Sequence, residues 1–470
     1  MLHLIELKLD RNLKVTLNEQ IYRAIKIAIN KGNLPKGARL PSWRDLAAQL
    51  GVSRGTVRLV YEKLLADQLI LSSKAKGTVV ADLPSMPILN NDQHRQEVIL
   101  PLQQQRGGYA PLPFQLGVSS KNAFPATLFT RIGAQQTRNQ FAKAPAYPDP
   151  RGLYQLRSEI AGHLAITRGI QCNPTQIIIT SGYSGGLGLV LMALGLENKK
   201  AWMEEPGYPL TRRGLELARL IIEPISVDNQ GILVDEGIIK APDAKLAIIT
   251  PGQQAPLGMS LSLDRRLQIL DWANQAQAWI IEDDYLSDLQ LQGRAAPALA
   301  SLDRTGRVIH IGSFSKTLTP SLRIGFVVAP LQKAALFAEV AMCLTSQPSV
   351  TTQLTVADFM HQGHYIRHLR RLKRLYAANR DIIIKHLSPS ISNQSIAGLS
   401  AILPIQSQCN DVDISKECLT YGLAPSPLST WYAGKNCRKG LLLGIASLAP
   451  NLINKSCEDL KKVLNKFELL

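Results

Sequence analysis

Residues 310 to 326 read HIGSFSKTLTPSLRIGF, and they place one lysine, Lys316, in a turn between two strand-like apolar runs. Serine and threonine flank the lysine, and Arg323 follows seven residues later. A lysine that loses hydration near a cation has a lowered pKa and can then attack an aldehyde to form a Schiff base. Taken alone, Ser-x-Ser-Lys is a weak signal, because most such pairs lie by chance on a protein surface. The surrounding sequence has to decide between these interpretations.

Strand-like apolar runs alternate with helical segments on both sides of this turn. The runs are IIIT from residue 177, KLAIIT from 245, AWIIEDD from 278, RVIHIG from 307 and IGFVVAP from 324. This alternation is typical of an α/β domain with a mostly parallel sheet. From the basic segment that begins at His364, the chain instead indicates a smaller α+β part. Ligands of such sheets bind at the carboxyl ends of the strands, so polar residues there carry the most information.

Two side chains at one strand end suit an aromatic nitrogen ring. Asp283 ends the run AWIIEDD, and Tyr285 follows two residues later. A carboxylate can keep a pyridine nitrogen protonated, and a phenol can bond the 3-oxygen of the same ring. Tyr208 in EEPGYP could lie flat on that ring. The plainer alternatives are a helix cap or magnesium site for the aspartates and simple packing for the tyrosine.

Donors for a phosphate lie at the ends of three other segments. The run SGYS at residues 181 to 184 stands between a strand and a helix N-terminus, and Ser313 and Arg323 flank Lys316. Backbone N–H groups at a helix start and an arginine fork both bind phosphate, although a lone Ser-Gly turn is usually only a turn. An aldehyde-trapping amine, a pyridinium partner, a phenol and a phosphate cradle together describe a site for pyridoxal 5'-phosphate.

The N-terminal eighty residues have a different pattern. Residues 17 to 29 predict an amphipathic helix, Ser42 and Ser53 cap two further helices separated by the turn LGVS, and LILSSKAKGTVVA predicts a hairpin with Gly77 in its turn. Three helices and a hairpin form a winged helix-turn-helix. Its third helix is predicted to bury Val57, Val60, Tyr61, Leu64 and Leu65 on one face.

Arginines on the second and third helices suit a DNA groove. Arg54 and Arg58 lie one helical turn apart near the start of the third helix, and Arg44 begins the second. Such donors reach base edges and phosphates in helix-turn-helix complexes. A solvated arginine face on an ordinary helical domain is the alternative explanation for any one of them.

The overall composition agrees with a soluble, DNA-binding chain. The net charge is +17 over 470 residues, and this excess is densest at the N-terminus. The six cysteines show no Cys-x-x-Cys pair and no histidine spacing typical of zinc, so we expect no metal site and a reducing compartment. Without a membrane span or signal peptide in the sequence, we expect a bacterial cytoplasmic protein associated with the nucleoid.

The sequence predicts three parts. Residues 1–82 form the winged helix-turn-helix, residues 83–114, rich in Pro, Gln, Gly and Asn, form a linker, and residues 115–470 form the α/β domain. Within the last, we expect a large part over about 115–365 and a small part over about 366–470.

Two sets of motifs resemble known families. The run LPSWRDLAAQLGVSRGTVRLVYEKLLADQLI with its G-T-x-V wing is similar to the DNA-binding domain of GntR-type regulators. The segments YPDPRG, IIITSGYSGGL, EEPGYP, TPGQQAPLG, IIEDDY and GSFSKTLTPSLRIGF resemble, in that order, the aminotransferase-like (fold type I) part of the MocR subfamily. The resemblance covers nearly the whole chain.

The resemblance implies a role for each matching residue. Lys316 would carry the Schiff base, Asp283 would pair with the ring nitrogen, Tyr285 would bond the phenolic oxygen, and Tyr208 would stack on the ring. The implied phosphate ligands are Tyr183, Ser184, Ser313 and Arg323, together with Tyr147 from the partner subunit of a homodimer. The implied DNA-binding residues are Arg44, Ser53, Arg54, Thr56, Arg58, Lys76 and Gly77.

The chain departs from the family pattern at two positions. Gln253 stands in the cofactor loop where a histidine is expected, and a glutamine forms hydrogen bonds but does not titrate. Leu442 stands where aminotransferases place an arginine that clamps the substrate carboxylate, although Arg438 and Lys439 are near enough in sequence to substitute.

These features favour a DNA-binding transcription regulator that senses pyridoxal phosphate, or an amine or amino acid, and thereby controls binding to operator DNA. The alternatives are an active aminotransferase with an appended DNA-binding domain and a protein-binding winged helix with a decayed cofactor site. The basic run from His364 to Arg380 is interpreted as a helix that links the large and small parts, with its arginines solvated.

Overall fold

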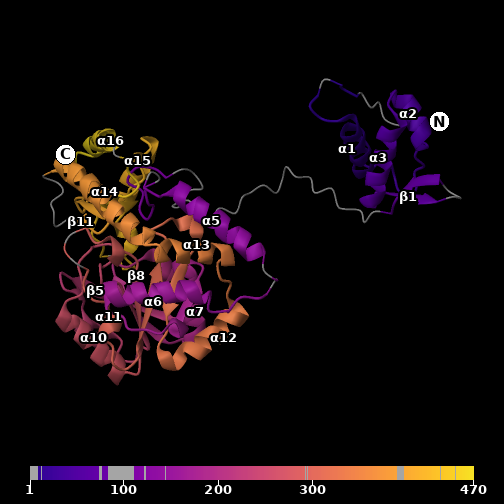
Figure 1. The fold of residues 1–470 in the computed structure, drawn as a ribbon. Coiled ribbons are helices and arrows are strands. Elements are labelled where there is room, and N and C mark those ends of the chain that lie inside the picture. The colour runs from indigo at the N-terminus through magenta and orange to yellow at the C-terminus, as the bar shows by residue number, and fades with distance from the viewer. Residues whose placement is uncertain are drawn as a thin grey trace. The chain divides into compact units, whose positions relative to one another are not determined.

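A computed structural model describes most of the chain: residues 9–11, 13–73, 77–82, 111–120, 123–142, 144, 146–291, 293, 295–388, 396–434, 436–449 and 451–469. The chain divides into two compact units, Met1–Gln105 and Arg106–Leu470, which are colour-coded along the ribbon in Figure 1. Each unit has its own hydrophobic core. No helix in the described part of the chain is long and apolar enough to cross a membrane.

The first unit is a winged helix-turn-helix. Its elements are α1 (Leu17–Asn30), α2 (Trp43–Leu50), α3 (Arg54–Ala66), β1 (Ile70–Ser73) and β2 (Gly77–Val80). The hydroxyls of Ser42 and Ser53 accept hydrogen bonds from the backbone N–H groups of Asp45 and Thr56, which starts α2 and α3 where the sequence predicts. Gly51 adopts a left-handed conformation that ends α2 and allows the tight turn.

One face of α3 packs against α1 and α2. Val57, Val60 and Leu64 are buried there together with residues of α1. The prediction that Leu65 shares this face is wrong, because the side chain is 39% exposed. Leu64 and Leu65 are adjacent on a helix and therefore point about 100° apart, so only one of them reaches the core.

The second unit is built on an eight-stranded sheet of order β3-β10-β9-β8-β7-β4-β5-β6. Its strands are β3 (Ile177–Thr180), β4 (Lys200–Glu205), β5 (Ile221–Asp228), β6 (Gly231–Ile232), β7 (Leu246–Ile249), β8 (Trp279–Asp284), β9 (Val308–Ser313) and β10 (Gly325–Val328). The central strands pair in parallel, whereas β10 is antiparallel to both of its neighbours. The mostly parallel sheet predicted from the apolar runs is therefore confirmed.

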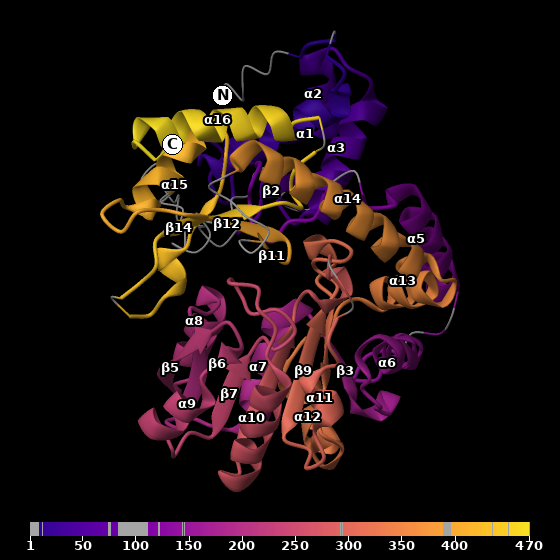
Figure 2. The same ribbon diagram turned by 90° about the vertical axis from the view of Figure 1, so that its left-hand side faces the viewer.

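Helices cover both faces of this sheet (Figures 1 and 2). Side chains of α7 (Gly182–Leu194), α8 (Pro209–Leu217) and α12 (Ala334–Leu344) pack with one set of alternating strand residues. On the opposite face lie α6 (Tyr154–Arg168), α9 (Val234–Lys240), α10 (Leu263–Gln275) and α11 (Leu299–Leu302). Successive residues of β8 illustrate the alternation, since Ile280 joins one core and Ile281 the other.

The small part of this unit has its own core and sheet. Its elements are α14 (His364–Leu387), β11 (Ile396–Ala397), β12 (Ser400–Pro404), α15 (Asp411–Thr420), β13 (Ser426–Pro427), β14 (Gly440–Gly444) and α16 (Ile453–Lys466). In Figure 2, α14 runs from beside α16 towards α5 (Ala126–Phe141) and α13 (Val350–His361), which lie together at the right of the view. Leu369, Leu372 and Tyr376 of α14 are buried, as expected for a linking helix.

A segment before the large sheet ties the two parts together. Phe114, at the end of the predicted linker, is fully buried in the small core, and its carbonyl accepts a hydrogen bond of 2.8 Å from the Gly444 N–H. The segment then continues to Gly117 and Ser119, which contact the Lys316 turn. Most of the predicted linker, residues 83–110, lies outside the described residues. We name residues 111–120 the strap.

We expect Leu64→Ala to lower the free energy of unfolding of the first unit by about 2–5 kcal/mol, because it leaves a cavity in a small core. In chemical denaturation of the full chain, the transition of the first unit should move to a lower denaturant concentration, and the transition of the second unit should not change. Leu65→Ala, one residue away on the exposed face, is the matched control. Equal destabilisation by both substitutions would contradict the described packing of α3.

Candidate functional site

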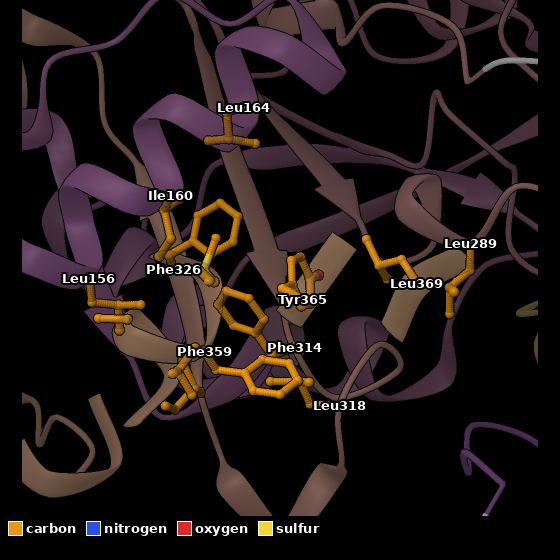
Figure 3. Close-up of a cluster of buried hydrophobic side chains, with 14 of the residues drawn as sticks. Leu156, Ile160, Leu164, Leu289, Phe314, Leu318, Phe326, Phe359, Tyr365 and Leu369 are labelled. Carbon is orange, nitrogen blue, oxygen red and sulfur yellow. The ribbon is translucent and has the colours of Figure 1, made fainter. Parts of the chain in front are cut away.

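The turn after β9 holds Lys316 in a fixed position. Phe314 and Leu318 on either side of the lysine are buried in the core cluster of Figure 3, so the turn is anchored at two points. The Nζ of Lys316 donates to the carbonyl of Gly117 at 2.8 Å, and the hydroxyl of Ser119 donates to the Lys316 carbonyl at 2.9 Å. The apolar anchors thus leave the amine directed at the strap.

Gly117 is a glycine for two geometric reasons. Its φ of +78° lies in the left-handed region, and a Cβ built on it would come within 2.8 Å of the Lys316 Nζ. A side chain at this position would therefore displace the amine. The strap approaches Lys316 as closely as a backbone without Cβ allows.

Asp283 lies on β8, the strand parallel to β9, with Ile311 as its neighbour in the register. Its side chain is only 7% exposed. Burial, the adjacent Asp284 carboxylate and Glu204 raise its pKa to about 8, against which a hydrogen bond from Tyr183 and the charge of Lys316 act in part. The carboxyl is therefore suited to a new cation, such as a protonated ring nitrogen, which would return it to the ionised form.

Three polar side chains surround Asp283 on the side of β4. Tyr208, Thr211 and Glu204 line one small cavity together with Asp283. The Tyr183 hydroxyl lies 2.8 Å from the Thr211 hydroxyl and also bonds Asp283. That hydroxyl is therefore engaged at the carboxyl, and Tyr183 could meet a phosphate with its backbone N–H in the first turn of α7.

Tyr208 connects the cavity to the small part of the unit. Its ring centroid lies 5.6 Å from that of Trp431, at an interplanar angle of 40°. A planar ligand beside Asp283 would thus be bordered by Tyr208, which in turn contacts Trp431 of the small part.

The protein groups predicted to bind a phosphate come together at the ends of three neighbouring strands. Gly325 of β10 pairs with Thr180 of β3 on one side and with Ser313 of β9 on the other. Ser313 is half-buried at the end of its strand, and Ser184 is exposed in the first turn of α7. This helix start offers unpaired backbone N–H groups, as an anion site requires.

Arg323 reaches the same helix start. It adopts a left-handed backbone conformation with φ of 50°, and its guanidinium donates to the Ser181 carbonyl at 2.9 Å. A Cβ on Gly182 would lie 3.4 Å from the guanidinium carbon. The absence of a side chain at Gly182 therefore gives the arginine room beside the N-terminus of α7.

The other cofactor residues lie around this centre. Tyr285 is half-buried, and burial together with the Asp283 charge raises its phenol pKa, so it stays a hydrogen-bond donor. Gln253 is 8% exposed; its Nε2 donates to Gln290 at 3.3 Å, and its Oε1 is buried with no hydrogen-bond partner among the described residues. Tyr147 is fully exposed.

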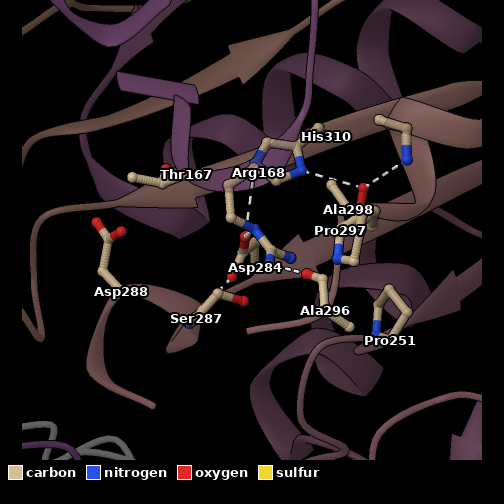
Figure 4. A network of polar contacts seen from close by, with 12 residues as sticks. Thr167, Arg168, Pro251, Asp284, Ser287, Asp288, Ala296, Pro297, Ala298 and His310 are labelled. Atoms are coloured by element: carbon tan, nitrogen blue, oxygen red, sulfur yellow. Dashed lines mark hydrogen bonds and ion pairs between the residues drawn. The ribbon is translucent and has the colours of Figure 1, made fainter. Parts of the chain in front are cut away.

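Sequence reasoning missed a network of buried charges around Arg168, Asp284 and His310 (Figure 4). Arg168 of α6 donates to Asp284 at 2.7 Å, and His310 of β9 lies 3.1 Å from Glu282. Burial would raise the pKa of Glu282, but the His310 imidazole and Arg168 lower it to about 2. Side chains alternate along a strand, so these partners hold Glu282 and Asp284 on one face while Asp283 faces the other. The run of three acids was the available signal.

In the first unit the predicted DNA-binding arginines are exposed on α2 and α3. Arg54 forms no side-chain hydrogen bond with the other described residues, whereas Arg58 forms an exposed ion pair with Glu62 at 2.9 Å. Arg44 lies over the Trp43 ring, 4.9 Å from its centroid. The hydroxyls of Ser53 and Thr56 are 2.8 Å apart at the start of α3, so both serve the helix cap.

The wing carries one basic residue that sequence reasoning missed. Arg39 bridges Val79 of β2, and its guanidinium lies 3.3 Å from the position of a Cβ on Gly77. Lys76, the predicted tip of the wing, lies outside the described residues. The sequence reasoning considered only arginines on the second and third helices, and Arg39 lies before both of them.

Comparisons with known proteins agree with both units. Residues 120–438 match the family "Aminotransferase class I and II", and residues 17–80 match "Bacterial regulatory proteins, gntR family". The chain is 32% identical to "Probable rhizopine catabolism regulatory protein MocR" of Rhizobium meliloti, over 98% of this chain and 96% of that protein. It is 31% identical to "HTH-type pyridoxine biosynthesis transcriptional regulator PdxR" of Corynebacterium glutamicum, over 92% and 91% respectively.

Solved structures share the fold of the second unit. An archaeal alanine:glyoxylate aminotransferase superposes with a TM-score of 0.70, covering 78% of this chain and 93% of its own, at 24% sequence identity. At this identity the likeness establishes the fold, and the functional argument has to come from the residues of this chain.

The raised pKa of Asp283 makes the free energy of unfolding depend on pH. The folded, cofactor-free chain keeps this proton up to about pH 8, whereas the unfolded chain releases it near the ordinary value of 3.8. The unfolded state then binds fewer protons over this range, so stability falls as the pH rises through it. We expect Asp283→Asn to remove at most about 3 kcal/mol of the fall in unfolding free energy between about pH 5.5 and pH 8.

Urea denaturation of the cofactor-free protein at several pH values measures this effect. Burial raises the pKa of Glu204 to about 7, and Glu204 acts with the same sign in both proteins; because its charge also raises the pKa of Asp283, the difference between the curves reports the Asp283 proton together with this coupling. Asp243→Asn is the control, because Asp243 is exposed and its ion pair with Lys200 lowers its pKa. Parallel curves for the wild type and Asp283→Asn would contradict the raised pKa.

Proposed function

The chain belongs to the MocR type of GntR-family transcription regulators, and we propose that its aminotransferase-like domain binds pyridoxal 5'-phosphate and reports this occupancy to the DNA-binding domain. One observation carries the proposal. The amine of Lys316, the buried carboxyl of Asp283 and the guanidinium of Arg323 lie at the ends of adjacent strands of one sheet.

The described residues fit this cofactor group by group. The Lys316 amine is close enough to lower the pKa of Asp283, and the start of α7 with Arg323 offers donors for a phosphate. The Lys316 charge offsets only part of the effect of burial and of the neighbouring carboxylates on Asp283, so the pKa of Asp283 stays raised. A carboxyl in this state can accept a pyridinium as an additional cationic partner. When bound, the cofactor supplies an aldehyde that captures primary amines and a ring that withdraws electrons.

Each residue then has a distinct task. Lys316 would hold the cofactor covalently, Asp283 would keep its ring nitrogen protonated, and Tyr285 would donate to its 3-oxygen. Tyr208 would stack on the ring. Ser184, Ser313, Arg323 and the backbone of Tyr183 would bind the phosphate, and Gln253 would contribute hydrogen bonds without exchanging protons.

The site is connected to the small part through two backbone contacts of the Lys316 turn. His368 of α14 lies 2.8 Å from the Thr317 carbonyl, and Ser119 of the strap donates to the Lys316 carbonyl. Burial lowers the pKa of His368, so its neutral ring donates this bond. A shift of the Lys316 turn therefore moves α14 and the strap, which both run into the small core.

We further propose that the chain acts as a homodimer on operator DNA. Tyr147 is fully exposed in the single chain and would complete the phosphate site of the partner subunit. A dimer carries two helix-turn-helix units, so its operator should hold two half-sites whose spacing depends on how the two units are held. The occupancy of the cofactor site would change this geometry and thus the DNA affinity.

We expect Arg54→Ala and Arg58→Ala each to weaken specific DNA binding about 10- to 100-fold, since each removes a contact to a base edge or phosphate. The measurement is a titration of the full-length chain with its operator at several salt concentrations. Arg23→Ala is the control, because Arg23 is exposed on α1 and paired with Glu19. Retention of full affinity by both α3 variants would contradict the proposed orientation of the domain.

We expect Lys316→Ala to abolish covalent attachment of pyridoxal phosphate and, with it, the response of DNA affinity to the cofactor. Borohydride reduction followed by mass spectrometry should find a pyridoxyl group on Lys316 of the wild type and none on this side chain in the variant. Lys199→Ala, at an exposed lysine, should behave as the wild type. An operator affinity that is the same with and without bound cofactor in the wild type would refute the sensing function.

A further inference from the structure

Leu442, which stands at the position of the expected carboxylate-binding arginine, is surrounded by apolar side chains. Leu442 lies in β14, fully buried against Ile402 and Leu428. Four half-buried side chains complete this cluster: Leu116, Leu257, Trp431 and Tyr432. We name these seven residues the leucine wall.

The leucine wall borders the proposed cofactor site at two points. Leu116 precedes Gly117, whose carbonyl accepts the hydrogen bond from the Lys316 amine. Trp431 stands against Tyr208, with 5.6 Å between the ring centroids. A molecule that reaches the Lys316 amine from this side therefore lies against leucine and aromatic side chains.

The cations nearest to the leucine wall are directed elsewhere. Lys439 lies 4.0 Å from Asp411, which is fully buried and also accepts hydrogen bonds from the Ser429 backbone and hydroxyl. Arg212 donates to the carbonyls of Trp431 and Tyr432 and pairs with Glu205 at 3.6 Å. Arg212 could turn to a ligand only by giving up its bonds to the Trp431 loop, and Lys439 only by leaving the buried carboxylate of Asp411.

Arg438, the remaining candidate from the sequence, is exposed. Its neighbour Gly440 instead contributes a backbone N–H to the buried Asp411 at 3.2 Å. The segment after Tyr432 thus serves the loop and the Asp411 cluster, and its arginine is solvated. The charge and backbone of Arg438 act on the Tyr432 phenol at the edge of the leucine wall, while Lys439 is engaged at Asp411, so the substitution of the clamp by either residue stays a prediction.

We infer that the site selects primary amines with an apolar body and no carboxylate as the effector. This inference rests on the proposed function, since the amine would act at the cofactor held by Lys316. A carboxylate next to Leu442 would lose its hydration without gaining a cation, whereas an alkyl or aromatic body gains by leaving water. The ordinary α-amino acids are disfavoured for the same reason.

The loop that carries Trp431 makes the wall a fixed feature. Glu205 accepts hydrogen bonds from the N–H groups of Ala433 and Gly434 at 2.7 and 2.9 Å, and the Gly207 N–H donates to the Trp431 carbonyl at 3.1 Å. These bonds attach the loop to the strand end that carries Tyr208. The apolar surface is therefore held in place before a ligand arrives.

Matched ligands test this inference on the cofactor-loaded, full-length chain. Phenethylamine and L-phenylalanine differ only by the carboxylate, as do isoamylamine and L-leucine. Each ligand would be titrated at fixed pH while the absorption spectrum of the bound cofactor is recorded, and a thermal shift measurement provides a second readout. The ligands are compared by the concentration of their unprotonated amine. We expect the amines to reach half-saturation at a concentration at least about tenfold below that of the amino acids.

Variants at position 442 supply the reciprocal test. Leu442→Arg should reverse the preference within each ligand pair, because it offers a guanidinium to the carboxylate. Leu442→Met, which keeps volume and polarity, should retain the wild-type preference. The ligand comparison in the wild type decides the matter even if Leu442→Arg fails to fold.

The outcomes separate the two proposals. Equal or tighter binding of the amino acids to the wild type overturns the amine selectivity, and so does a spectrum that no amine changes, while the cofactor-sensing function stands in both cases. A chain that takes up no pyridoxal phosphate overturns the proposed function and this inference together.

Discussion

The buried carboxyl of Asp283 is the constraint on which the site depends. It lies between Asp284 and Glu204, and together with burial these charges favour its protonated form. The two flanking acids on its strand have their own partners, Arg168 and His310, which keep them on the opposite face. The chain thus keeps one carboxyl whose ionised form Tyr183 and Lys316 favour only in part and an additional cation would favour further. Binding of a protonated ring there would couple ligand binding to stability.

This coupling reaches the rest of the unit through backbone contacts near Lys316. Phe314 and Leu318 fix the ends of the turn, while the strap and His368 hold its carbonyls. Because packed cores shift in discrete steps, the proposed function would require a change in this turn to be passed to α14 as a movement of the helix. The strap provides a second connection from the same turn to Phe114 in the small core.

Local patterns were sufficient to predict the elements and their order. Ser42 and Ser53 start their helices by short-range hydrogen bonds, and the apolar runs form strands because they are buried on both faces. Contacts between distant segments could not be predicted in this way. Arg168 and Asp284 are 116 residues apart, and Phe114 joins the small core from the end of the predicted linker. Leu65 shows the same limit on a smaller scale, since periodicity alone did not determine which leucine faces α1.

With the leucine wall in place of a carboxylate-binding arginine, the contacts between the large and small parts near the site are made by the chain itself. A carboxylate clamp would make closure of the small part depend on the charge of the ligand, because the arginine gains its partner only on binding. Here Arg212 and Glu205 join the large part to the Trp431 loop through backbone groups of the chain itself. The loop is therefore held against the large part without an anionic ligand, and the inferred ligand would add apolar contacts. Apolar contacts are insensitive to ionic strength, whereas contacts between a protein and DNA phosphates are strongly weakened by salt. Under the proposed function, the two units would therefore respond to different properties of their surroundings.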